Sequence, residues 1–297
     1  MITDAHPAPR DHDARFFGDL PRTDYGVVVG NCQAESVRLV LDSDELPLVR
    51  VPPVYLLDAA ATRRLHEVVA GAAALIAQPV KDDYHGLPLG TRQLAASLPP
   101  SGRAVTFPIV RFTGLHPFQA ALHVPGVEET PPLVAYHDVR TLALAAGAPV
   151  RERLDPDGVR AEAAASLAEL RRREETLDVA ASDLFAEPRF DLVRTVNHPG
   201  NGVILALGDR ILRALGRDGA ARDPGRPLLN AVHAPREDWV IDAWGLDAHA
   251  VPDWTVDGRR VDPAEVRDAH LAWYLEHPQF VRGAVDRLRP TLERWRR

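Results

Sequence analysis

The chain is poor in cysteine and lysine: its 297 residues include one cysteine, Cys32, and one lysine, Lys81. A lone cysteine excludes an intramolecular disulfide framework, so we expect a reduced thiol that either packs in the core or acts chemically. No apolar run approaches the length of a membrane span, and the segment Met1 to Arg15 lacks the apolar stretch of a secretory signal. We therefore expect a cytoplasmic protein without a membrane span.

Excess positive charge is also absent, because the formal net charge at pH 7 is −7. This balance argues against a nucleic-acid partner. The sequence contains neither G-x-G-x-x-G nor G-x-x-x-x-G-K-[ST], so a dinucleotide or P-loop site is not supported. His116, His137 and His198 could supply metal ligands together with aspartates, but no pair has the close helical spacing of H-E-x-x-H. We expect no bound metal.

What is present is an alternation of apolar strand patterns with helical patterns. Strands are predicted near residues 25–29, 49–55, 72–77, 104–107 and 190–196, and helices near 34–41, 58–69 and 203–215. This alternation predicts an α/β fold with a doubly wound parallel sheet.

The remaining segments are expected to extend this sheet. Residues 1–22 read as an N-terminal lead and residues 23–218 as the α/β domain, with a helical insertion at about 155–187 that is rich in Ala, Glu, Arg and Leu. Residues 219–297 read as a C-terminal extension that packs on the main domain and ends in a helix from about Pro263.

The tetrad Gly30-Asn31-Cys32-Gln33 is the most informative part of the sequence, because it stands where the first predicted strand turns into a helix. Backbone N–H groups and the positive end of a helix favour thiolate, which is how a nucleophile is displayed. Cysteine is also among the residues most often buried, so a packing role is the competing interpretation.

His198 is the leading candidate for a base, since it too follows an apolar strand and precedes a helix. The alternative is a capping role in the turn Asn197-His198-Pro199. The spacing of Cys32 and His198 resembles the layout of SGNH hydrolases, with Cys in place of Ser. The aspartate normally found three residues before that histidine is Thr195 here, so the orienting acid is missing unless another carboxylate such as Asp191 supplies it.

A larger set of motifs resembles the WcbI-type polysaccharide biosynthesis proteins, acetyltransferases of capsule assembly that bind coenzyme A. The matching residues are Gly30-Asn31-Cys32-Gln33, Gln78-Pro79 with Asp83-Tyr84, Leu89-Gly90-Thr91, Phe107-Pro108, Gly114 with His116-Pro117, Tyr136-His137-Asp138 and Asn197-His198-Pro199. The resemblance runs from about Tyr25 to Gly216, so it covers most of the chain and adds little beyond that point.

The resemblance implies transfer of an acetyl group from acetyl-CoA to a sugar hydroxyl in capsular or extracellular polysaccharide synthesis. Cys32 and His198 would be catalytic, and ten residues in all are candidates for the site: Cys32, His198, the positioning or oxyanion residues Gly30, Asn31, Gln33 and Gln78, and the ligand contacts Asp83, Tyr84, His116 and His137. Transfer through a covalent acyl-enzyme and direct transfer with His198 as base both stay open. So do an SGNH-like esterase or thioesterase, and a noncatalytic protein that binds coenzyme A or a glycan; oligomeric state is not predicted.

Overall fold

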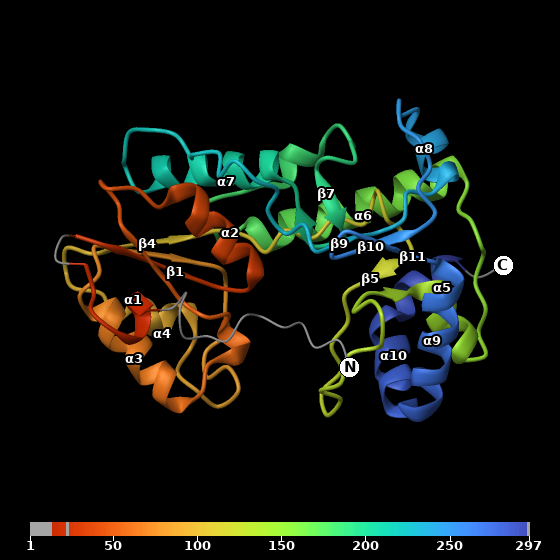
Figure 1. The fold of residues 1–297 in the computed structure, drawn as a ribbon, viewed down its shortest axis with the longest axis horizontal. Coiled ribbons are helices and arrows are strands. Elements are labelled where there is room, and N and C mark those ends of the chain that lie inside the picture. Colours follow the sequence, from red (N-terminus) through yellow and green to blue (C-terminus); the bar gives the residue numbers. More distant parts are fainter. Residues whose placement is uncertain (1–13, 22–23, 296–297) are drawn as a thin grey trace.

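The fold is built around a short parallel sheet, shown in Figure 1. The structure is a computed structural model and describes residues 14–21 and 24–295. Its central sheet has four parallel strands in the order β2-β1-β3-β4: β1 (Gly26–Val29), β2 (Leu48–Arg50), β3 (Ala74–Ala77) and β4 (Arg103–Thr106). Every residue of β1 and β3 is buried, as expected for central strands that are covered on both faces.

Helices cover both faces of this sheet. On one face, α2 (Cys32–Leu41) and α7 (Asn201–Ala214) pack over Val28 and Ile76. On the other, α3 (Ala59–Ala70) packs over Val27 and Leu75, together with α1 (Ala14–Phe17), α4 (Thr91–Ala95) and the 3-10 turn η1 (Val54–Leu56). Neighbouring residues of a strand thus face opposite layers, which follows from the two-residue period of a β-strand.

Cap residues explain where these helices begin. The Asp58 carboxylate accepts a hydrogen bond from the Ala61 N–H at the start of α3, and the Asn31 side chain does the same for Gln33 at the start of α2. The predicted helices near 34–41, 58–69 and 203–215 are confirmed as α2, α3 and α7, with each boundary within two residues of the predicted one.

From residue 119 onward the chain adds short antiparallel strands instead of further parallel ones. They are β5 (Gln119–Ala120) with β6 (His137–Asp138), β7 (Val193–Thr195) with β8 (His198–Pro199), and β9 (Val232–His233), β10 (Trp254–Val256) and β11 (Arg259–Val261). The prediction that residues 190–196 return to the parallel sheet is wrong, because β7 pairs antiparallel with β8. What the structure shows is a mixed α/β fold with a central sheet of four parallel strands.

The predicted helical region at 155–187 contains one long helix, α6 (Pro156–Glu174), and a 3-10 turn, η2 (Ser182–Phe185). Asp155 caps α6, and the proline in its first turn suits a helix start. Helix α6 packs against α8 (Asp238–Trp244). The predicted helical insertion is therefore packed on the rest of the fold through α8.

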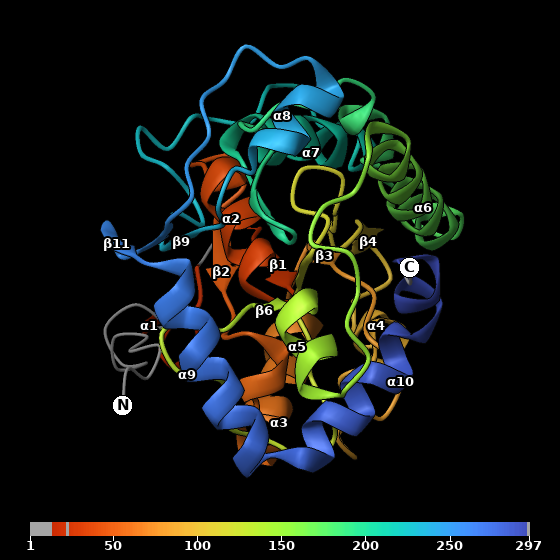
Figure 2. The same cartoon turned by 90° about the vertical axis from the view of Figure 1, so that its right-hand side faces the viewer.

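The C-terminal helices α9 (Pro263–Glu276) and α10 (Pro278–Trp295) pack on α5 (Val139–Ala145), as Figure 2 shows. Leu292 and Trp295 of α10 belong to the same core cluster as Val28 of the central sheet. The C-terminal segment is thus continuous with the main core, while the domain boundaries drawn from the sequence stay predictions. Most of the expected N-terminal lead, residues 1–22, lies outside the described residues. In the part of the chain that the structure describes, no helix is both long and apolar enough to cross a bilayer.

Candidate active site

Cys32 is the first residue of α2 and is half-buried. The preceding Asn31 accepts a hydrogen bond through Oδ1 from the N–H of Gln33, at 2.9 Å. The thiol is therefore carried on the first turn of a ten-residue helix, where backbone N–H groups and the helix dipole favour a negative charge.

Gly30 and Gln78 fix the turn that leads into this helix. The N–H of Asn31 donates to Oε1 of Gln78, at 2.8 Å. A Cβ atom on Gly30 would lie 2.3 Å from that same Oε1, so only glycine lets the two strand ends approach so closely. Thr91 in turn holds Gln78, because its hydroxyl donates to the Gln78 carbonyl at 2.9 Å. Gly30 and Gln78 thus set the position of Cys32 through the backbone.

Gln33 joins three separate loops. Its Nε2 donates to the carbonyls of Val110, at 2.9 Å, and Asn197, at 2.7 Å. Its Oε1 accepts from the N–H of Val110, at 2.9 Å, and from Nε2 of Gln78, at 3.4 Å. Both amide hydrogens of Gln33 are therefore used within the protein, and its structural role is that of a clamp. Of the two side-chain amides proposed as oxyanion donors, Asn31 is the one whose Nδ2 makes no hydrogen bond to a described residue.

His198 lies at the start of β8, next to the Asn197 carbonyl that Gln33 binds. Cys32 and His198 are thus the immediate chain neighbours of the two residues joined by one 2.7 Å hydrogen bond. The ring of His198 meets the Tyr136 ring edge to face at 5.7 Å. Tyr136 also donates its hydroxyl to Oδ1 of Asn197, at 2.7 Å. The loop that carries the histidine is therefore held on both sides.

The His198 side chain lacks an orienting acid. Its Nδ1 is buried and has no hydrogen-bond partner among the described residues. Asp191, the carboxylate considered from the sequence, is exposed and forms an ion pair with Arg189 at 3.2 Å. Burial lowers the pKa of His198 to about 4, and the nearby Arg194 and His233 act in the same direction. The imidazole is neutral at pH 7 and can accept a proton.

His116 and His137, the other two histidines predicted for the site, lie in different surroundings. His116 is buried, and its Nδ1 hydrogen-bonds to the carbonyl of Pro235 at 3.1 Å. His137 is also buried, but within an aromatic cluster, where Nδ1 lies 2.6 Å from the Tyr274 hydroxyl and the ring stacks on Phe280 at 4.6 Å. The surroundings of His137 favour a packing role, and its predicted ligand contact stays a prediction.

Asp83 and Tyr84 lie in the loop between β3 and α4. The exposed Asp83 adopts a positive φ of 52° and accepts a hydrogen bond from Nε2 of Gln93 at 2.7 Å, so Gln93 holds the turn. This loop follows Gln78 directly, which places both residues at the same end of the sheet as Cys32. They stay candidates for ligand contact.

Arg111 is a residue that sequence reasoning missed. Its chain neighbours are anchored on both sides of the site: Val110 binds Gln33, and the N–H of Phe112 donates to the carbonyl of Val196 at 2.8 Å. The side chain is exposed, yet surrounding protein removes enough water to lower its pKa, as do the charges of Arg173 and Arg287. An arginine so placed suits an anionic ligand, and in an arginine-rich chain nothing in the sequence singles it out.

Comparison with known proteins identifies the family of this chain. A sequence model of a family described as "Polysaccharide biosynthesis enzyme WcbI" matches residues 25–220. The chain belongs to the WcbI family of polysaccharide biosynthesis enzymes. The region matched to the WcbI family contains Cys32, His198 and every residue of the Gln33 clamp.

A solved WcbI structure shares the fold, with a TM-score of 0.73, at 20% sequence identity. The match covers 92% of this chain and 99% of that one. That structure is described as native WcbI, a novel polysaccharide biosynthesis enzyme, without a disulfide bond between coenzyme A and one of its cysteines. A search of curated proteins found no match. Among the described residues of this WcbI-family protein, no group of three or more His, Cys, Asp or Glu side chains is placed to hold a metal ion.

Proposed function

We propose that this WcbI-family protein transfers an acyl group, most simply acetyl, from coenzyme A to a hydroxyl group of a sugar. The observation that carries the proposal is the Gln33 clamp, which holds a cysteine at a helix start beside a loop bearing a neutral histidine. The neighbouring WcbI structure, whose description mentions a disulfide between coenzyme A and a cysteine, supports a thiol within reach of that substrate.

In the covalent version, the Cys32 thiolate attacks the thioester carbonyl. The tetrahedral oxyanion forms next to the start of α2, where the helix dipole and Nδ2 of Asn31 stabilise it. The thiolate of coenzyme A then leaves, and the sugar hydroxyl attacks the acyl-cysteine while His198 takes the hydroxyl proton. Cys32 is released as thiolate when the ester forms.

In the direct version, the sugar hydroxyl attacks the thioester while His198 takes its proton, and Cys32 only lines the site. With water as acceptor, the same groups would make an esterase or thioesterase of SGNH-like layout. Among the described residues Nδ1 of His198 has no orienting acid, which departs from the layout of such hydrolases. We further propose that the acceptor sugar belongs to capsular or extracellular polysaccharide synthesis and that the reaction takes place in the cytoplasm.

Intact mass spectrometry after incubation with acetyl-CoA tests the covalent version. We expect one acetyl group on the wild-type protein and none on Cys32→Ala. The matched control is His198→Ala, which should still carry the acetyl group because its predicted role is in the second half of the reaction. A Cys32→Ala protein with full transferase activity would exclude the covalent path, and release of acetate without transfer to any sugar would favour the hydrolase.

A further inference from the structure

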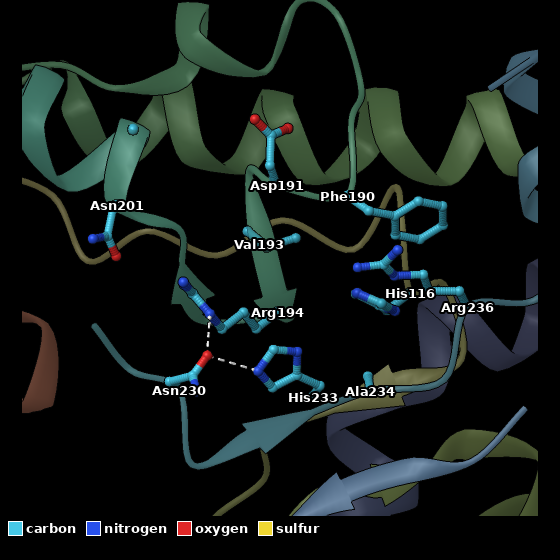
Figure 3. A pocket seen from close by; sticks show the side chains of 11 residues that line it. His116, Phe190, Asp191, Val193, Arg194, Asn201, Asn230, His233, Ala234 and Arg236 are labelled. Carbon is cyan, nitrogen blue, oxygen red and sulfur yellow. Dashed lines mark hydrogen bonds between the residues drawn. The ribbon is translucent and has the colours of Figure 1, made fainter. Parts of the chain in front are cut away.

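A cavity of about 330 Å³ opens between β7, β9 and the start of α7, and Figure 3 shows its lining. Its walls come from three segments far apart in the sequence, and the residues are His116, Phe190, Asp191, Val193, Arg194, Asn201, Gly202, Asn230, His233, Ala234 and Arg236. The cavity adjoins the proposed active site, because Nη1 of its residue Arg194 donates to the carbonyl of Pro199, next to His198, at 3.3 Å. We call it the basic pocket.

Two half-buried arginines give the basic pocket its charge. Arg194 donates through Nε to Oδ1 of Asn230 at 3.2 Å, and Arg236 lies over the Phe190 ring at 5.0 Å. Neither guanidinium forms an ion pair with any described carboxylate. The one acidic lining residue, Asp191, pairs with Arg189, and in Figure 3 its carboxylate points away from Arg194. Two unpaired guanidinium groups on one cavity are a strong site for a phosphate.

The start of α7 adds hydrogen-bond donors to the same cavity. Its cap residue, Gly200, offers no side chain to the first N–H groups of this 14-residue helix. The first two residues of the helix, Asn201 and Gly202, line the basic pocket. A Cβ on Gly202 would meet no atom within 4 Å, so this side of the helix start is open. Helix starts of this kind bind anions.

His116 points to a second chemical feature of the ligand. The side chain is only 3% exposed, and in Figure 3 its ring points into the pocket. Because Nδ1 hydrogen-bonds to a carbonyl, it must carry the hydrogen, which leaves Nε2 as an acceptor. Nε2 is buried and has no hydrogen-bond partner among the described residues. The carbonyl of Val193 also lies near this ring, but it cannot donate to Nε2. A hydroxyl of a ligand can.

We propose that the basic pocket binds a phosphorylated sugar, with Arg194 and Arg236 on the phosphate and Nε2 of His116 accepting a hydrogen bond from a sugar hydroxyl. The assignment of this sugar phosphate to the acceptor rests on the proposed function, whereas its binding does not. The same chemistry, a phosphate monoester on a hydroxyl-bearing sugar, also occurs at the 3′-phosphoribose end of coenzyme A, so the test separates these two sources.

Isothermal titration calorimetry on the full chain, with glucose 1-phosphate as probe and glucose as its phosphate-free control, tests the site. We expect glucose 1-phosphate to bind and glucose not to. Arg236→Gln should weaken binding by about tenfold or more, since a charge-assisted phosphate contact contributes about 1.5–3 kcal/mol. The Arg236 side chain makes no hydrogen bond to a described residue, so this variant should fold. The matched control is Arg259→Gln, which replaces an exposed arginine on β11 and should bind the probe like wild type.

Coenzyme A and dephospho-coenzyme A then distinguish the two sources. Binding of glucose 1-phosphate to protein saturated with coenzyme A would support the acceptor assignment. Displacement by coenzyme A but not by its dephospho form would overturn that assignment and give the pocket to the donor. No binding of the probe, or equal weakening by Arg236→Gln and Arg259→Gln, would overturn the site itself. None of these results depends on acetylation of Cys32, so failure of the proposed function would be seen separately by mass spectrometry.

Discussion

Two groups of histidines with buried ring atoms have opposite surroundings in this molecule. His137 and His270 lie between α5, α9 and α10, where Nδ1 of His137 meets the Tyr274 hydroxyl and Nε2 of His270 meets the carbonyls of Pro132 and Val134. His198 and His116 lie near the start of α7, and each has a buried nitrogen without a partner among the described residues. Burial lowers the pKa in both groups.

A lowered pKa therefore does not by itself mark a functional histidine. Desolvation acts on both groups, but only His116 and His198 have a buried ring nitrogen without a partner among the described residues. Such an atom costs about 1–3 kcal/mol. Such a cost is understandable where a ligand supplies the missing partner. The following predictions test whether the two groups divide into function and packing.

The largest effect is expected from removing one histidine of each group. His198→Ala should lower kcat for acyl transfer by about 10² to 10⁴, the usual contribution of a positioned base, with little change in melting temperature. His137→Ala should instead lower the free energy of unfolding by about 2–4 kcal/mol by leaving a cavity in the aromatic cluster, while folded molecules keep their kcat. Steady-state kinetics and urea unfolding on both variants measure this. The reverse pattern would show that His137 acts in the reaction and that His198 is a packing residue.

Acid should destabilise the protein through both groups. The pKa values of His116 and His198 are about 4 and that of His137 about 3, against 6.5 for an ordinary histidine. In the unfolded chain these three side chains take up protons below pH 6.5. In the folded protein the same side chains stay neutral until a far lower pH. Stability is therefore complete above pH 6.5 and falls from there towards about pH 4, by roughly 3 kcal/mol for each histidine. Urea unfolding between pH 7 and pH 5 measures the slope, and a flat profile would contradict the burial of these rings.

Two glycines beside His198 form a matched pair. A Cβ on Gly200 would lie 1.9 Å from the Asp191 carbonyl oxygen, whereas one on Gly202 would meet nothing within 4 Å. Gly200→Ala should push the β7–β8 turn apart, with a cost of about 1–3 kcal/mol in stability and a loss of activity as His198 moves. Gly202→Ala should leave stability unchanged and His198 in place. Thermal melting and kinetics on the two variants check this, and equal behaviour would show that the turn does not position His198.

The smallest effects are expected from two tyrosine hydroxyls. Tyr274→Phe leaves Nδ1 of His137 without its partner and should cost about 1–3 kcal/mol in stability. Tyr136→Phe should cost less, because Oδ1 of Asn197 still accepts from the Thr195 hydroxyl at 3.3 Å. We expect Tyr136→Phe to lower kcat by a few fold through the His198 loop and Tyr274→Phe to leave kcat unchanged. Unfolding curves combined with kcat values would separate the two.

The elements with strong local signals could be predicted from the sequence. The strand at 25–29 and the helix capped by Asp58 carry long apolar patterns and a cap residue, and both are present. Strands β5 to β11 have only two or three residues each, too few to show a two-residue period. The separate sheet of β7 and β8 was missed because pairing direction is set by tertiary packing and has no local sequence signature.

The residues of the candidate site also fall into those that the sequence reveals and those that only the fold reveals. Cys32 could be found because a strand-to-helix turn is visible in sequence, and His198 because it stands in similar chain context. The clamp role of Gln33 could not, since it depends on where Val110 and Asn197 lie in space. Arg111, Arg194 and Arg236 are hidden by composition: in a chain whose basic residues are almost all arginine, none stands out until the fold shows which lack an acidic partner.

The Gln33 clamp also sets the order in which this site can come into being during synthesis. Its hydrogen bond to Asn197 spans 164 positions of the chain, whereas its contacts with Gln78 span 45. A ribosome therefore exposes the cysteine first and supplies the histidine loop only after the 164 positions between Gln33 and Asn197 have been added. The nascent chain can form the parallel sheet and the helix that carries Cys32 first. The proposed acyl-transfer site is completed last, when the loop of Asn197 and His198 binds the Gln33 side chain.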